Sequence, residues 1–320
     1  MILMNPSTAP ARFARRQQLF AALCVLASLM LWSPLKALLG LTLQDERYTH
    51  ILVVPIVSAA FLYFERERIF RDARYCPVIG VPLILLGLLF FCVGILRRSV
   101  ALDATLAAGA LVLLWIGSFV LCYGGASFRH ASFPLLFLLL IVPIPSVVLD
   151  KVIVALQAGS AEVAYRLFRL GGVPVFRHGM QMSLPGVDIA VAPQCSGIRS
   201  TMALFIAGAV LSRVLLRTSW ARILTILCVG PIGIFRNAVR IVGISSLAVY
   251  VDRGFLSGNL HRYGGLPFSL VGFVILIPLV WLLRRWEQHL GGDRVGLVES
   301  GLGGDGVSCP AEPKVGRASR

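Results

Sequence analysis

The sequence predicts an all-α polytopic membrane protein with about eight transmembrane helices, an amphipathic interfacial helix and a short extended segment on the outer face. Of its 320 residues, 57% are hydrophobic and 14% are charged, whereas a soluble globular chain is about 45–50% apolar and roughly 25% charged. The hydrophobic residues also fall in blocks, several of which approach the ~20 residues that a helix needs to cross a ~30 Å hydrocarbon core. These observations exclude both a disordered chain and an ordinary cytosolic enzyme.

The first apolar block follows a short basic N-terminus, residues 1–17, and covers about residues 18–35. A secretory signal peptide has the same layout, but no cleavage site of small residues ends this block, so we expect a retained helix. Four further spans are expected before residue 150, over residues 48–64, 78–96, 100–123 and 132–149. The last of these carries Pro143 and Pro145 near its end, where a helix can be broken.

The pattern changes after the fifth span. From Asp150 to Leu170, polar and charged residues interrupt the apolar ones at roughly helical spacing, which predicts an amphipathic helix at the membrane interface. Residues 171–193 then alternate apolar and polar residues between glycines and prolines. This alternation favours two short strands or extended segments, at residues 173–175 and 187–191.

The C-terminal half contains three more expected spans, over residues 198–214, 223–250 and 266–283. Gly230-Pro231-Ile232-Gly233 lies in the seventh span and predicts a kink or discontinuity there. Residues 291–320 are rich in Gly, Ser, Pro and charge without periodicity, so we expect a disordered cytoplasmic tail. Residues 18–290 are then one transmembrane domain.

The charge distribution sets the expected orientation. The net charge is +15, with 30 basic against 15 acidic residues, but most arginines flank the apolar blocks, as the positive-inside rule describes. We therefore expect the excess of positive charge to face the lipid bilayer, and we do not expect nucleic acid as a partner. Counting arginines loop by loop places both chain ends in the cytoplasm, with residues 150–197 and 251–265 on the outer side.

Two arginines fall where a membrane span should be apolar. Arg236 and Arg240 lie in the seventh span four residues apart, on one helix face, with Asn237 as a polar neighbour. An ionisable side chain inside a span is costly unless it is paired or hydrated. An anionic group, or a carbonyl that develops negative charge, would explain two like charges on one face. The alternatives are an internal ion pair with an aspartate and snorkelling toward the surface.

A cysteine and a histidine are candidates for the chemistry. Cys195 lies at the expected N-terminus of the sixth span, where the helix dipole favours a thiolate, among polar residues that include Ser196 and Arg199. A small buried hydrophobe is the alternative interpretation. His261 lies in the outer loop before the eighth span and is a candidate general acid or base, unless it is merely solvated. His50, at the outer end of the second span, could line the same cleft.

The spacing of cysteines and histidines gives no sign of a metal site. The seven cysteines are scattered and no CxxC pair occurs, so we expect neither a metal ion nor a cofactor.

Three motifs occur in a fixed order along the chain. They are Cys195-Ser196-Gly197 continued by Ile198-Arg199-Ser200, then Arg236-Asn237-Ala238-Val239-Arg240-Ile241, then His261. Tyr48-Thr49-His50 leading to Pro55, and Pro143-Ile144-Pro145 at the end of the fifth span, support them. Together, over about residues 48–283, they resemble the exosortase/archaeosortase family of membrane transpeptidases.

The resemblance implies a function and a site. It implies a catalytic Cys195, Arg240 and His261, with Arg236 as a second contributor. It implies a membrane-embedded cysteine transpeptidase or protease that cleaves C-terminal sorting signals of exported proteins through a thioester on Cys195. Such a signal consists of a Pro-Glu-Pro-like motif, an apolar helix and a basic cluster. In bacteria these systems accompany exopolysaccharide production, which implies the cytoplasmic (inner) membrane with the active site on its outer face.

A transporter or flippase linked to exopolysaccharide export is the alternative function, because carriers also place charges beside broken helices in the membrane. Inverted repeats, which that alternative predicts, are not evident in the sequence. The depth of Arg240 is a difficulty for the transpeptidase. It lies about ten residues before the outer end of its span, or roughly 15 Å deep at 1.5 Å per residue. The cognate signal, the acceptor nucleophile and the oligomeric state stay open.

Overall fold

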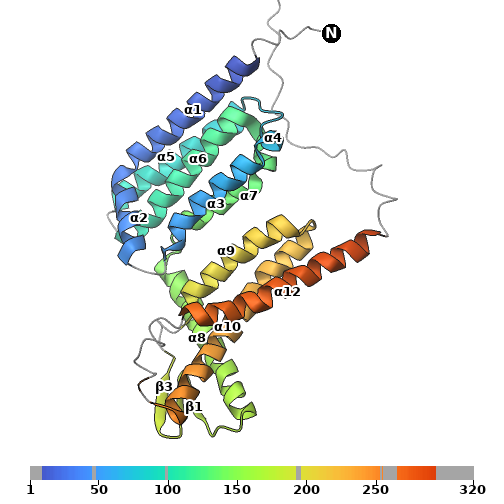
Figure 1. The fold of residues 1–320 in the computed structure, drawn as a ribbon. Coiled ribbons are helices and arrows are strands. Elements are labelled where there is room, and N and C mark those ends of the chain that lie inside the picture. The colour runs from blue at the N-terminus through green and yellow to red at the C-terminus, as the bar shows by residue number, and fades with distance from the viewer. Residues whose placement is uncertain are drawn as a thin grey trace, which may run out of the picture. The chain divides into compact units, whose positions relative to one another are not determined.

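The structure is a computed structural model that describes residues 9–44, 48–97, 100–191, 196–252, 254 and 265–292. The chain divides into two compact units, with the division between Pro145 and Ser146. Within the described ranges both units are helical, except for one small sheet in the second (Figure 1). Each unit is described by itself.

The first unit is built around α6, with α1 and α5 packed along it (Figure 1). Its elements are α1 (Ala9–Met30), α2 (Trp32–Gln44), α3 (His50–Phe64), α4 (Arg66–Ile69), α5 (Pro77–Arg97), α6 (Val100–His130), α7 (Ser132–Phe137) and the 3-10 helix η2 (Leu138–Ile141). A glycine allows the close approach of α5 and α6, because a Cβ on Gly80 would lie 2.6 Å from the Cα of Leu121. Aromatic rings fill one end of the unit, where Tyr123 meets Phe70 at 4.7 Å and Phe119 at 5.0 Å between centroids.

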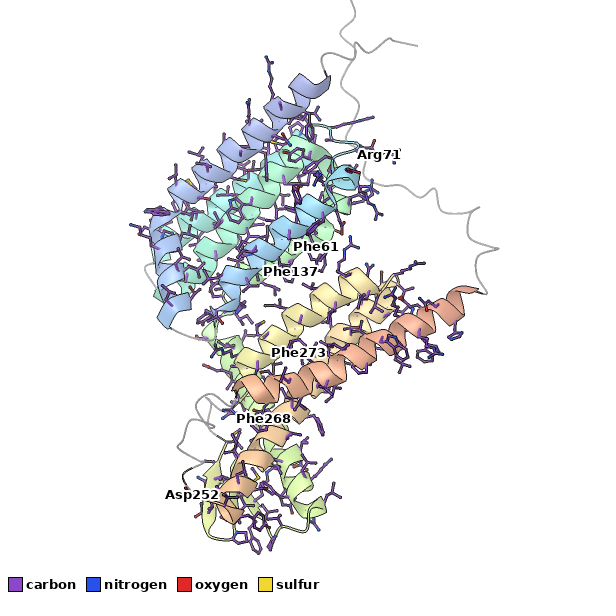
Figure 2. The ribbon with its side chains drawn as sticks, in the orientation of Figure 1. Phe61, Arg71, Phe137, Asp252, Phe268 and Phe273 are labelled. Carbon is purple, nitrogen blue, oxygen red and sulfur yellow. The ribbon has the colours of Figure 1, made fainter. Side chains whose placement is uncertain are left out.

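The second unit combines a helix bundle with the sheet. Its elements are α8 (Ser146–Leu170), β1 (Phe176–His178), β2 (Gln181–Leu184), β3 (Val187–Ala190), α9 (Ile198–Leu215), α10 (Ser219–Tyr250) and α12 (Gly265–Gly292). Helices α9, α10 and α12 share a core to which Leu204, Val229 and Leu276 contribute. Figure 2 shows Phe268 and Phe273 projecting from α12; Phe273 packs against this core.

Helix α8 is amphipathic, as the sequence predicts. Its buried residues recur every three or four positions and so lie on one face: Leu149, Ile153, Leu156, Gln157, Ser160, Ala161, Ala164 and Phe168. The opposite face is largely exposed. One face of α8 therefore packs inside the second unit, and its location at a membrane interface stays a prediction.

The sheet has three antiparallel strands in the order β1-β2-β3. The predicted strand at 187–191 is confirmed as β3. The segment at 173–175, predicted as a short strand or an extended segment, is not a strand of the sheet: β1 begins at Phe176, after Pro174, whose nitrogen cannot donate a hydrogen bond. The middle strand, Gln181–Leu184, was not expected. It buries Met182 in one core with Phe168 of α8 and Ala238 of α10.

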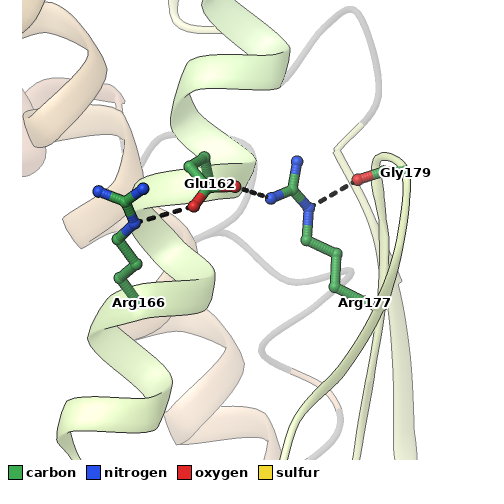
Figure 3. Close-up of polar contacts among 4 residues, drawn as sticks. All are labelled: Glu162, Arg166, Arg177 and Gly179. Atoms are coloured by element: carbon green, nitrogen blue, oxygen red, sulfur yellow. Dashed lines mark hydrogen bonds and ion pairs between the residues drawn. The ribbon is translucent and has the colours of Figure 1, made fainter.

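A group of charged residues joins the sheet to α8 (Figure 3). The carboxylate of Glu162 on α8 accepts a hydrogen bond from Arg166 at 2.8 Å and pairs with Arg177 on β1. The Nε of Arg177 also donates to the carbonyl of Gly179 in the turn that follows, at 2.8 Å. These contacts attach the first hairpin to the exposed side of α8.

Apolar helices occupy all eight predicted positions. Five described helices are long and apolar enough to cross a membrane: Pro77–Leu96, Ala104–His130, Ile198–Leu215, Ser219–Tyr250 and Phe268–His289. Two bent pairs raise the number to seven if each is one span: Phe13–Met30 with Trp32–Gly40, and Ser132–Ile141 with Ser146–Leu170. The remaining position is α3, whose 15 residues are fewer than the ~20 of a full crossing. The chain is a multi-pass membrane protein.

Helix α10 is longer than a membrane is thick. It is helical from Ser219 to Tyr250, through Pro231, so the predicted discontinuity does not occur. The nearby glycine serves helix packing instead, since a Cβ on Gly233 would lie 2.6 Å from Oγ1 of Thr201 on α9. At 1.5 Å per residue, 32 residues extend about 48 Å, well beyond a ~30 Å hydrocarbon core.

Candidate active site

Arg236 is a buried cation in the middle of the second unit. It lies on α10, is only 3% exposed, and its Nη2 donates to the carbonyl of Gly197 at 3.3 Å. Its aliphatic part passes α12 closely, because a Cβ on Gly272 would lie 3.4 Å from Cδ of Arg236. Among the described residues no carboxylate lies within salt-bridge distance of its guanidinium. The charge is therefore met by a backbone carbonyl at the start of α9.

Gly197 is the point at which α9 begins and at which α10 touches it. It caps α9 in the left-handed conformation, with φ 75° and ψ 13°, which glycine adopts without steric cost. A Cβ at this position would lie 2.8 Å from Nη2 of Arg236 and 3.1 Å from the side chain of Asn237. Both the backbone conformation and the available space therefore require glycine.

The turn around Gly197 is held by several hydrogen bonds. Its carbonyl accepts from the hydroxyl of Ser200 at 3.2 Å and from the backbone N–H of Thr201 at 2.9 Å, besides Arg236. The N–H of Ile198 approaches Oγ of Ser196 at 3.4 Å, and Ser196 is buried. The start of α9 is thus fixed to its own first turn and to α10.

Helix α8 reaches the same region from the other side. Nδ2 of Asn237 on α10 donates to the hydroxyl of Ser160 on α8 at 3.0 Å, and both residues are buried. One turn earlier on α8, Nε2 of the buried Gln157 donates to the carbonyl of Val191 at 2.8 Å. We call Gln157, Ser160, Arg236 and Asn237 the α8–α10 polar cluster.

Comparison with protein families gives a match over residues 32–278, which is well over half of the chain, to the model of the transmembrane exosortases. The chain belongs to the transmembrane exosortase family. Members of this family are generally considered transpeptidases. The match covers α8, the sheet, α9 and α10, and so includes the whole α8–α10 polar cluster. No curated protein and no solved structure matches the chain.

The structure places the residues predicted for an exosortase site in three groups. Arg236, Asn237 and Ser196 are buried and meet at Gly197. Arg240 is half-buried on α10, one turn beyond Arg236, and Arg199 is exposed in the first turn of α9. These positions belong to one unit, and all of them except Arg240 lie at the start of α9 or against it.

Three further residues were predicted for the site: His50, Cys195 and His261. His50 is the first residue of α3, in the first unit. Cys195 and His261 lie outside the described residues. Their catalytic roles stay predictions, based on the sequence motifs.

Two members of the α8–α10 polar cluster were not expected. No motif marks Gln157 or Ser160 in the sequence, and Gln157 only contributes to the polar pattern of its helix. The available signal is that both place polar groups on the face of α8 that otherwise buries Leu, Ile, Ala and Phe. A buried polar group is normally hydrogen-bonded, so these residues must have partners inside the protein.

Proposed function

We propose that this exosortase family member is a membrane-embedded cysteine transpeptidase or protease. It cleaves the C-terminal sorting signals of exported proteins through a thioester on Cys195. One observation carries the proposal: the buried pair Arg236 and Asn237 contacts Gly197, which lies two residues after Cys195 in the chain. The two separate motifs that gave the family resemblance therefore meet in space.

The reaction follows from the three predicted groups. His261 takes the proton of the Cys195 thiol, and the thiolate attacks the carbonyl carbon of the scissile peptide bond. A carbon–sulfur bond forms and the carbonyl oxygen becomes an oxyanion, which Arg240 stabilises. The peptide C–N bond then breaks, and the imidazolium returns its proton to the leaving amine. An acceptor amine or water gives its proton to the now neutral His261, attacks the carbonyl carbon of the thioester, and the carbon–sulfur bond breaks to release the thiolate.

The two arginines have different surroundings, which supports different roles. The guanidinium of Arg236 is buried and donates to a backbone carbonyl, so we assign it to holding the turn at Gly197. Arg240 is half-buried on the same helix face. The guanidinium of Arg240 lies one turn from Arg236 and keeps part of its surface exposed, and we assign the stabilisation of the oxyanion to it.

The length of α10 supports a site at the membrane surface. We place the start of α10 at the cytoplasmic boundary, because Arg217 and Arg222 lie there. About twenty helical residues then cross the core, and Arg240 lies near the outer boundary. The last ten residues of α10 extend beyond it, where Ile241 and Val242 pack against the core shared with the sheet. This placement removes the difference in depth expected from the sequence.

The expected partner is an exported protein anchored by its own C-terminal helix. Its Pro-Glu-Pro-like motif would lie just outside the membrane, at the level of Arg240, and its basic cluster would stay in the cytoplasm. The proposed location is the bacterial cytoplasmic (inner) membrane, with the active site on the outer face.

Replacement of Cys195 tests the proposal. Cys195→Ala and Cys195→Ser should abolish processing of an exported reporter that ends in a tripartite signal, while both proteins still insert into the membrane. Cys228→Ala is a matched control, because Cys228 lies on α10 within the helical core and has no role in the mechanism. Normal processing by Cys195→Ala would refute the transpeptidase and leave the transporter as the remaining function.

A further inference from the structure

We propose that Gln157 and Ser160 of α8 are positioning residues, which set the place of the Cys195 thiol without touching the substrate. This inference rests on the proposed function, because it needs Cys195 as the nucleophile. It adds to that function a second helix, which none of the sequence motifs includes.

Gln157 holds the chain on the N-terminal side of Cys195. Its Nε2 donates at 2.8 Å to the carbonyl of Val191, which follows β3 and precedes Cys195 by four residues. Gln157 is only 4% exposed, so water cannot readily replace the bond. An amide that donates in a buried site fixes the direction of the chain at that carbonyl.

Ser160 holds the C-terminal side through α10. Its hydroxyl accepts the Nδ2 of Asn237 at 3.0 Å, and the side chain of Asn237 lies directly against Gly197. Gly197 follows Cys195 by two residues. Ser160 therefore orients the side chain of Asn237, and Asn237 in turn packs against Gly197.

Gln157 and Ser160 both lie on the part of α8 that packs against α10. Gln157 and Ser160 are three positions apart on the buried face of α8. Helices α8 and α10 are in close contact beside them, because a Cβ on Gly159 would lie 2.9 Å from Cδ1 of Ile234. One turn of α8 thus holds Val191 directly and Gly197 through Asn237, and these are described residues on either side of Cys195 in the chain. Groups carried on packed helices are placed more accurately than groups on loops alone.

Accurate placement matters more for rate than for binding. A displacement of about 1 Å in a reacting group can lower the rate roughly a hundredfold. Loss of either hydrogen bond should therefore lower kcat, while the substrate helix still binds and KM stays nearly constant. A merely structural role for the two residues predicts instead less folded protein with normal kinetics per folded molecule.

The test uses substitutions that remove a hydrogen bond and keep the volume. Gln157→Met removes the donor to Val191, and Ser160→Ala removes the acceptor for Asn237. The matched control is Leu156→Ala, which removes buried apolar area from the neighbouring position on α8 without touching either bond. All are compared as full-length protein in membranes, by kcat and KM on a tripartite-signal reporter. The alkylation rate of Cys195 against pH, read from its peptide by mass spectrometry, is the second measurement.

We expect Gln157→Met and Ser160→Ala to lower kcat about ten- to a hundredfold with less than about a threefold change in KM. Both should also move the alkylation profile of Cys195 to higher pH, because a displaced thiol loses the helix N-terminus that favours its thiolate. Leu156→Ala should keep the wild-type profile and kcat.

The outcomes separate the two proposals. If Cys195→Ala abolishes processing but both polar variants match wild type in kcat and in alkylation profile, the positioning role is refuted and the transpeptidase stands. If Leu156→Ala shifts the profile as much as Gln157→Met does, the positioning role is likewise refuted. If Cys195→Ala processes normally, the transpeptidase fails and the positioning role fails with it.

Discussion

At the scale of single residues, the two arginines of α10 show how one helix face can serve two purposes. Arg236 lies against Gly197 and Gly272 and is almost without solvent contact. Burying a cation without a carboxylate is costly, and the backbone carbonyl of Gly197 offsets only part of that cost. Arg240, one turn further on, keeps part of its surface open. We therefore expect replacement of the buried Arg236 to change the stability of the fold, whereas replacement of Arg240 should change mainly the turnover rate.

Alanine substitutions of the two arginines should separate these roles. We expect Arg240→Ala to lower turnover about 10²–10³-fold, the loss typical of a missing oxyanion donor, with little change in melting temperature. Arg236→Ala should lower turnover and also the melting temperature by roughly 4–8 °C, because it leaves a cavity beside Gly197 and removes one hydrogen bond to its carbonyl, together worth about 2 kcal/mol. Turnover of a tripartite-signal reporter and thermal unfolding in detergent measure both effects. Equal melting temperatures for the two variants would contradict the division.

At the scale of elements, the sequence predicts helices better than it predicts their interruptions. Blocks of apolar residues located the apolar helices at all eight predicted positions, because length and hydropathy alone decide whether a segment can cross a membrane; they did not locate the short helix α4. Pro231 suggested a kink or a discontinuity, but α10 runs without a break through it, and Gly233 lies closely against Thr201 of α9. The middle strand was missed because Gln181–Leu184 is only four residues long and owes its burial to Phe168 and Ala238, which are distant in sequence.

The candidate site was predictable only in part, because some of its residues are buried by contacts with residues that are distant in sequence. Arg236, Asn237 and Ser196 stand out locally, as polar residues within or beside an apolar block. Gln157 and Ser160 do not, since an amphipathic helix always contains polar residues and periodicity alone does not say which of them face inward. Their importance depends on tertiary contacts with Val191 and Asn237, which no local pattern encodes.

The start of α9 gives a prediction at this scale. Gly197→Ala should destabilise the turn, because a left-handed conformation costs a non-glycine residue about 1–2 kcal/mol and the new Cβ would overlap Arg236. Processing should be lost with it. Gly230→Ala on α10 is the matched control: a Cβ there meets nothing within 4 Å, and alanine should stabilise the helix by roughly 0.5–1 kcal/mol. The test compares the two variants in melting temperature and in reporter processing. Equal values for both variants would disprove that position 197 requires glycine.

At the scale of the whole molecule, function depends on which side of the membrane the second unit faces. The family match covers residues 32–278, so it includes parts of both units. The proposed reaction needs the sheet and the start of α9 outside, because exported substrates are cleaved there. The arginines around α4, Arg66, Arg68, Arg71 and Arg74, should then lie in the cytoplasm.

Labelling of single introduced cysteines tests this orientation. His178 on β1 and Arg71 after α4 are both exposed, and Figure 2 labels Arg71, so cysteine at either position should react wherever the reagent has access. We expect a membrane-impermeant maleimide to label His178→Cys on intact cells and Arg71→Cys only after the membrane is permeabilised, with the unsubstituted protein as the background. The reverse pattern would place the α8–α10 polar cluster and Cys195 nearer the cytoplasm, where an exported protein could be processed only before translocation, and would exclude an outer-face transpeptidase.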